Sequence, residues 1–242
     1  YRPMPLSTRA HYGHVLSAGF GILLLSMVAG SLFLGDRLAA FGWIGLYTLL
    51  IALVYVIAMR LVFNFERRQV AAYIKEKTVL LKYEDIPLRT AVTKYALNAL
   101  VVVGAATFLR GIGTGLAEQT GLGQSFVGNI FIAITTSLPE VVVCVSALKI
   151  DAVDLAIGNL FGSNLFNVFI LALDDLFFVP GPLLSFANSG QVISALSAIA
   201  MTTIAVISLT YRAEKKALPM AWDSIAIVMI YIGNIMLLYT YR

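Results

Sequence analysis

Glu140 is the residue of this sequence best suited to bind a cation. It is the only charged residue between positions 122 and 148, in a stretch rich in apolar side chains. An ionised carboxylate within lipid is costly unless it faces a partner or an aqueous cavity, and such residues usually mark a transport path. Thr136 and Ser137 precede Glu140 by four and three residues, so a helix places all three on one face. Hydroxyl, carbonyl and carboxylate oxygens bind hard cations, and the pattern predicts a site for Ca²⁺ or Na⁺.

Pro139, directly before Glu140, is expected to kink this helix. Proline lacks the backbone N–H, and its ring crowds the carbonyl oxygen one turn earlier, here that of Thr135. Carbonyls freed in this way are tolerated inside a membrane where they line a site enclosed by protein. The alternative interpretation is a kinked helix in which Glu140 is only a structural hydrogen-bond partner.

A second polar cluster follows, with the sequence GNLFGSNLFN from position 158 to 167. Ser163 and Asn167 are four residues apart and share a helical face. Gly158 and Gly162 form a pair of small residues that allows another helix to approach closely. Alone, such a segment is more often a packing interface than a site. Coming shortly after the Pro139 kink, it predicts a helix that completes the cation site.

The composition of the chain indicates an integral membrane protein. Apolar residues make up 60% of the 242 residues and charged residues 12%, whereas soluble domains have about 45–50% and about 25%. The single cysteine, Cys144, excludes a disulfide framework within the chain. A membrane-spanning helix needs about 20 mainly apolar residues. Seven stretches qualify and predict an all-α fold of seven transmembrane helices in a lipid bilayer: 13–35, 39–64, 90–116, 122–148, 153–177, 189–210 and 221–240.

The positions of the basic residues predict the orientation of these helices, because Lys and Arg accumulate on the cytoplasmic side. Fourteen of the 17 lie on one predicted side, and Arg37, Arg110 and Arg242 lie on the other. We therefore expect the N-terminal end of this chain in the cytoplasm and the C-terminal end outside, in a plasma (inner) membrane. The net charge of +4 then reflects orientation, and no nucleic-acid partner is expected.

An internal repeat predicts two related halves. The segments 3–6 (PMPL) and 180–183 (PGPL) are alike, as are 13–18 (GHVLSA) and 190–195 (GQVISA). Both pairs are displaced by 177 positions (3 to 180 and 13 to 190), and two motifs rarely share a displacement by chance.

This repeat divides the chain into 1–64, the last two helices of a first half, and 90–242, a second half of five helices. The polar segment 65–89 is the predicted cytoplasmic loop between them. The first half shows no counterpart of 89–177. We therefore expect about 90 residues of partner structure, in the same gene product or a separate chain, and ten helices in two inverted halves, as in many secondary transporters.

The segment TSLPE at 136–140, followed by GN at 158–159 and GSNLFN at 162–167, resembles the alpha-repeat of the sodium/calcium exchanger superfamily. With its helices the alpha-repeat covers about 122–177, and the five-helix pattern extends the resemblance to about 89–242. The resemblance implies an antiporter that exchanges Ca²⁺ against Na⁺ at a central site shared by two inverted alpha-repeats, without a cofactor.

The resemblance also implies roles for single residues. Glu140 matches the central carboxylate that serves both ions, and Thr136 and Ser137 match further ligands. Ala133 would contribute its carbonyl oxygen to an outer sodium position, with Ser163 beside it.

Asn167 matches a position that is Asn in many family members and Asp in others. Asn offers a neutral carbonyl and has no proton to release, which leaves the ion stoichiometry and any role of protons open. The family site also needs a second glutamate from the first repeat. Because Glu140 alone leaves Ca²⁺ undercharged, this chain by itself is expected to bind Ca²⁺ poorly.

Two alternatives to a sodium/calcium antiporter remain: a proton-coupled or other cation exchanger of the same fold, and a non-transporting scaffold subunit with a relic alpha-repeat. An enzyme is not expected, because no histidine lies near Ser137 or Ser163 to act as a base. His14 is expected at the membrane boundary, and Asp174 and Asp175 at the outer end of their helix.

Overall fold

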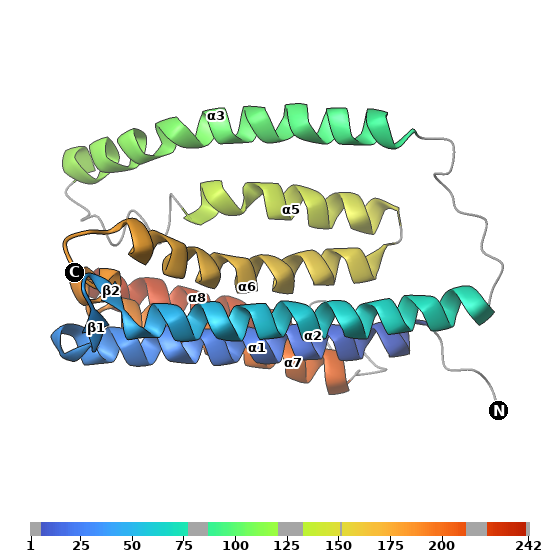
Figure 1. Ribbon diagram of the computed structural model, residues 1–242, viewed down its shortest axis with the longest axis horizontal. Helices are drawn as coiled ribbons and strands as arrows, with labels where there is room; N and C mark the ends of the chain where they lie inside the picture. The colour runs from blue at the N-terminus through green and yellow to red at the C-terminus, as the bar shows by residue number, and fades with distance from the viewer. Residues whose placement is uncertain (1–5, 77–86, 121–132, 151, 212–221, 241–242) are drawn as a thin grey trace. The chain divides into compact units, whose positions relative to one another are not determined.

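The computed structural model describes residues 6–76, 87–120, 133–150, 152–211 and 222–240, and most of them are helical (Figure 1). The chain divides into two compact units, one formed by 1–69 with 137–242 and the other by 70–136. The second unit contains α3 (Leu88–Thr120). All contacts described below lie within the first unit unless the text says otherwise.

The elements of the first unit follow one another from the N-terminal helix to the C-terminal one. In chain order they are α1 (Leu6–Leu34), η1 (Gly35–Arg37), β1 (Ala40–Phe41), β2 (Ile44–Gly45), α2 (Leu46–Glu76, up to residue 69), α5 (Ala133–Lys149, from residue 137), α6 (Val153–Phe177), η3 (Leu183–Phe186), α7 (Gln191–Tyr211) and α8 (Trp222–Thr240).

Among the residues that the structure describes, five helices are long and apolar enough to cross a membrane, and they agree with five of the seven predicted spans. They lie in Gly13–Arg37, Leu46–Arg68, Val153–Phe177, Gln191–Tyr211 and Trp222–Thr240. α3 covers the predicted span 90–116. The predicted span 122–148 lies partly outside the described residues, and α5 supplies its described part. An all-α membrane protein is therefore confirmed, whereas the count of seven helices and the ten-helix repeat stay predictions.

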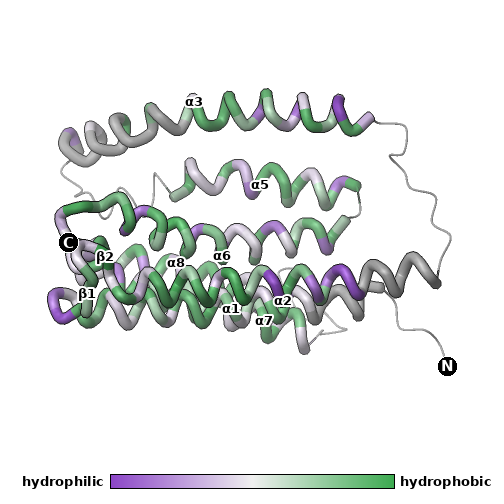
Figure 2. The backbone as a smooth tube through the Cα atoms, viewed as in Figure 1, coloured by the Kyte–Doolittle hydropathy of each residue, from purple (hydrophilic) through white to green (hydrophobic). Residues whose placement is uncertain are grey.

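The core of the first unit forms where α1 packs against α6 and α7, while α8 packs against α7. Leu24 of α1, Ile51 of α2 and Leu165 of α6 are fully buried at this core. Tyr55 of α2 stacks on Phe169 of α6, with ring centroids 4.2 Å apart. Figure 2 shows that α2 is mainly hydrophobic over the part that follows β2 and hydrophilic beyond it, and the hydrophobic part is as expected for a helix with one face on the core and another toward lipid.

The second predicted span begins later and its helix continues further than expected. A short antiparallel hairpin precedes it, in which Ala40 pairs with Gly45, and Gly42 adopts a positive φ of 67° that glycine accepts without strain. Beyond position 64 the apolar run ends, but α2 continues to Glu76. The length of an apolar run reflects the thickness of the bilayer, and a helix can continue beyond it. The predicted loop 65–89 therefore begins with helical residues, and 77–86 lie outside the described residues.

Asp175 anchors three elements at the end of α6. Its side chain is fully buried. One carboxylate oxygen accepts hydrogen bonds from Tyr47 (2.6 Å) and the backbone N–H of Leu183 (2.6 Å), and the other from Thr48 (2.5 Å) and the N–H of Gly45 (2.8 Å). The donors lie at the N-terminal ends of α2 and η3, where backbone N–H groups lack partners within their own helix and a negative charge is favourable. The sequence pattern predicts Asp175 at an interface, whereas in the structure it is a buried, fully hydrogen-bonded anchor.

Candidate functional site

Glu140 lies on α5, which continues as a helix through Pro139. Pro139 therefore does not end the helix, and the predicted kink remains a prediction. Upstream of Glu140, the hydroxyl of Thr136 donates a hydrogen bond to the backbone oxygen of Ala133 at 3.2 Å, within the second unit. Ser137 is exposed.

α5 and α6 meet beside Glu140. The side-chain amide of Asn159 donates to the backbone oxygen of Glu140 at 3.4 Å and to the sulfur of Cys144 at 3.6 Å. The thiol of Cys144 donates in turn to the backbone oxygen of Ala156 at 3.4 Å. These contacts join two consecutive turns of α5 to one stretch of α6. They connect α5 to α6 at the residue that carries the candidate carboxylate.

One oxygen of the Glu140 carboxylate receives no hydrogen bond from the described residues. This oxygen, Oε2, is buried. A buried hydrogen-bond acceptor without a partner is unfavourable, and folded proteins contain few of them. A bound ion is one explanation for such an atom. A carboxylate oxygen suits a cation for this purpose, since hard cations bind to oxygen ligands.

Ser163 and Asn167 follow Asn159 on α6 by one and two helical turns. The hydroxyl of Ser163 donates to the backbone oxygen of Leu160 at 3.0 Å, and Asn167 is exposed. Within the described part of the chain, no hydrogen bond joins either side chain to Glu140. Their role as ion ligands remains a prediction.

The two glycines of α6 differ in their surroundings. A Cβ atom at Gly158 would lie 3.5 Å from the imidazole of His14, so Gly158 faces α1. A Cβ atom at Gly162 would have no neighbouring atom within 4 Å, so the described residues make no close approach there. The pattern predicted a close neighbour for both glycines, and the structure places one beside Gly158.

Asn159 is the contact residue that sequence reasoning missed. Asn159 follows Gly158 in the segment GNLFGSNLFN at 158–167, so its membership of the motif could be read from the sequence. Nothing in that motif indicates that its amide reaches the backbone of Glu140, 19 residues earlier. The sequence feature that could have indicated this contact is the spacing, since Asn159 precedes Ser163 by one helical turn.

The chain matches the family model described as sodium/calcium exchanger protein over residues 92–240, which is more than half of its length. The chain belongs to the sodium/calcium exchanger family. The match covers α5 and α6 and therefore Glu140, Asn159 and the polar cluster of α6. Cation antiport through a membrane is the activity that this family membership suggests.

Three curated proteins are similar to this chain. It is 32% identical over 142 residues to the sodium/calcium exchanger MaX1 of Methanosarcina acetivorans, covering 58% of this chain and 38% of the relative. It is 26% identical over 181 residues to the inner membrane protein YrbG of Escherichia coli, covering 74% and 55%. It is 28% identical over 145 residues to the putative antiporter CaxA of Alkalimonas amylolytica, covering 60% and 42%.

The chain thus spans about half or less of the length of these relatives. No solved structure matches the chain. By name, one relative is a sodium/calcium exchanger, one an inner membrane protein and one a putative antiporter, in agreement with an integral membrane protein.

Proposed function

We propose that this exchanger exchanges Ca²⁺ against Na⁺ and that Glu140 is the carboxylate to which both ions bind in turn. The observation that carries the proposal is the buried Oε2 of Glu140, which no donor among the described residues reaches. Family membership and the name of the archaeal relative supply the class of ions.

The site needs more negative charge than Glu140 supplies. One carboxylate neutralises half of the charge of Ca²⁺, and the amide of Asn167 adds no charge. We infer that a second carboxylate comes from a first alpha-repeat, carried by the same gene product or by another chain. Thr136, Ser137 and Ser163 would add hydroxyl oxygens, and Ala133 its carbonyl oxygen.

Ion flux in proteoliposomes tests the proposal. Vesicles loaded with Na⁺ and containing the gene product that carries this sequence are diluted into Na⁺-free medium with radioactive Ca²⁺. We expect Ca²⁺ uptake that requires the Na⁺ gradient, that Glu140→Gln abolishes and that Glu140→Asp partly retains. Asp36→Asn is the matched control, because Asp36 is an exposed acidic residue in η1.

Uptake that continues unchanged in Glu140→Gln would remove Glu140 from the site. Absence of Ca²⁺ uptake in well-folded wild-type protein, with either a Na⁺ or a pH gradient, would instead favour the scaffold alternative.

A further inference from the structure

The end of the first unit that Asp175 anchors carries an apolar surface. Among the described residues, the three most exposed large apolar side chains are phenylalanines, and all three lie at this end: Phe33 in the last turn of α1 (81%), Phe41 in β1 (84%) and Phe177 at the end of α6 (83%). A phenylalanine side chain has no polar group, so three of them in contact with water would be unfavourable. They indicate that an apolar partner covers this end.

The connection between α1 and α2 is apolar as well. After Asp36 and Arg37 in η1, residues 38–45 have the sequence LAAFGWIG, which contains no charged side chain. Loops that face water are usually polar. The hairpin β1–β2 that this segment forms contacts α6 and lies at the shared end of α1, α2 and α6 (Figure 1).

Many polar groups of the hairpin are hydrogen-bonded within the protein. The two strands pair with each other, and the N–H of Leu46 donates to the backbone oxygen of Ala39 at 2.9 Å. The indole N–H of Trp43 donates to the backbone oxygen of Leu176 at 3.2 Å. A segment can enter an apolar environment only when its backbone groups find partners within the protein. The hairpin is built in this way, while its Phe41 side chain stays exposed.

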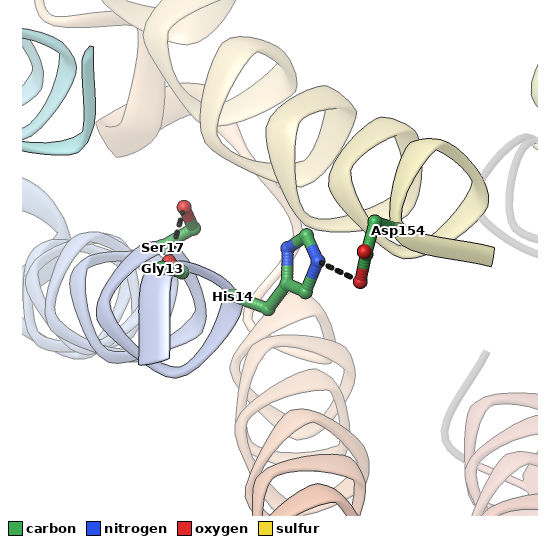
Figure 3. A network of polar contacts seen from close by, with 4 residues as sticks. All are labelled: Gly13, His14, Ser17 and Asp154. Carbon is green, nitrogen blue, oxygen red and sulfur yellow. Dashed lines mark hydrogen bonds and ion pairs between the residues drawn. The ribbon is translucent and has the colours of Figure 1, made fainter. Parts of the chain in front are cut away.

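The opposite ends of the same helices are polar. There the imidazole of His14 on α1 lies 3.5 Å from the carboxylate of Asp154, in the first turn of α6 (Figure 3). Glu66, Arg67 and Arg68 of α2 are exposed at that end. The uncharged hairpin and the most exposed phenylalanines are therefore a property of one end of the unit and not of every helix end.

The apolar end continues into a surface that faces lipid. Four leucines of α2 follow the hairpin and are exposed: Leu46, Leu49, Leu50 and Leu53. Because α2 is long and apolar enough to cross the membrane, its exposed apolar face contacts acyl chains. Asp36 and Arg37, exposed just before the hairpin, suit the headgroup region, since a long side chain such as arginine can reach out of the apolar layer. The continuity of the two surfaces indicates lipid as the partner of the hairpin.

We propose that the hairpin at 38–45 is a membrane anchor that inserts Phe41 into the apolar edge of one leaflet, with Phe33 and Phe177 in the same layer. The partner is lipid, and no further protein covers this end. Because Trp43 ties the hairpin to the end of α6, the anchor also sets the depth of that helix in the bilayer. The inference does not depend on the proposed antiport function.

Spin labels on the gene product that carries this sequence test the anchor, in vesicles of phosphatidylcholine and phosphatidylglycerol. Labels are attached to Phe41→Cys and, separately, to Phe177→Cys, each in a Cys144→Ala background. Asp36→Cys is the matched control, because Asp36 is an exposed residue at the same end. Molecular oxygen collects in hydrocarbon and a charged nickel chelate stays in water, so the collision rates of the label with both report its surroundings. We expect the oxygen-to-nickel ratio to be several-fold higher at positions 41 and 177 than at position 36.

Two outcomes would overturn the anchor. Low collision rates with both reagents at position 41 would mean that protein covers the hairpin, either a second copy or another part of the gene product. A ratio at position 41 as low as at position 36 would mean that the hairpin lies in water. The label at position 177 decides in the same way if Phe41→Cys does not fold.

Trp43 provides a measurement that leaves Phe41 in place. In a variant with Trp222→Phe, and with any other tryptophan of the gene product also replaced by phenylalanine, the fluorescence reports on Trp43 beside the tip of the hairpin. Lipid brominated on the acyl chain close to the headgroup should quench this fluorescence more strongly than a water-soluble quencher does. Quenching by the water-soluble reagent alone would contradict the anchor.

Discussion

Thr48 and Asp175 are 127 residues apart in sequence, yet the hydroxyl of Thr48 donates a hydrogen bond to the buried carboxylate of Asp175 at 2.5 Å. This bond joins the start of α2 to the end of α6. Through Leu183 the same carboxylate also holds the start of η3. The end of α6, the start of α2 and the start of η3 therefore meet at one acidic side chain. We infer that the packing at this end of the unit depends on Asp175.

Asp175→Asn is expected to destabilise the protein strongly. The substitution removes the charge and points an NH₂ group at backbone or hydroxyl donors, which leaves at least one buried donor unpaired. We expect a loss of roughly 3 kcal/mol, measured as a fall in the thermal unfolding midpoint in detergent. The neighbouring exposed Asp174 provides the matched control, and Asp174→Asn should unfold as wild type. Equal midpoints for both variants would refute the role of Asp175 as an anchor.

Tyr47→Phe tests the same anchor with a smaller change. The hydroxyl of Tyr47 donates to Asp175 at 2.6 Å and accepts from the backbone N–H of Leu184 at 3.1 Å. Removing it leaves that N–H without its acceptor and keeps the ring in the core. We expect a loss of about 1–2 kcal/mol. Because Tyr47 and Asp175 are in contact, the double variant should lose less than the sum of the single ones.

Asn159→Leu is expected to weaken ion binding more than it slows turnover. Leucine has a similar size but cannot donate to the backbone oxygen of Glu140 or to Cys144. The backbone at Glu140 then loses a contact with α6, and we expect the KM for Ca²⁺ in flux assays to rise roughly tenfold with little change in the maximal rate. Asn164→Leu on the exposed side of α6 is the control. A maximal rate that falls while KM stays constant would contradict this role.

Asn167→Asp tests whether the neutral amide of Asn167 limits the pH dependence of Ca²⁺ flux. An aspartate there adds a group that can bind and release a proton, so Ca²⁺ flux should become more dependent on pH than in wild type, with a lower KM for Ca²⁺ at alkaline pH. Flux over a range of pH and Ca²⁺ concentrations measures both. Identical profiles for the two proteins would indicate that Asn167 does not face the ion path.

The apolar spans were predictable because the length and hydropathy of each segment are local properties of its sequence. Hydropathy located five helices without knowledge of their neighbours. It did not locate the hairpin at 40–45 or the continuation of α2 to Glu76, because these depend on turn geometry and on polar residues with good helix propensity.

The polar contacts were less predictable, because their partners are far apart in sequence. Asp175 sits at the end of an apolar helix, where interfacial exposure is common, and three of its four donors lie at positions 45–48. His14 was expected at the membrane boundary for the same reason and is buried against α6. For the candidate site, the motif predicted Glu140 and the polar helix after it. The actual link between the two, through Asn159, required the packing of α5 on α6.

The carboxylate of Asp175 also sets an order of events during synthesis. The backbone N–H of Gly45 bonds to a residue that lies 130 positions later in the chain. At ribosomal rates, roughly ten seconds pass between the appearance of the donor and that of its acceptor. During that interval the start of α2 has been made but has no anion to cap it. The start of α2 therefore lacks this anchor until the ribosome has delivered α6 and the turn after it.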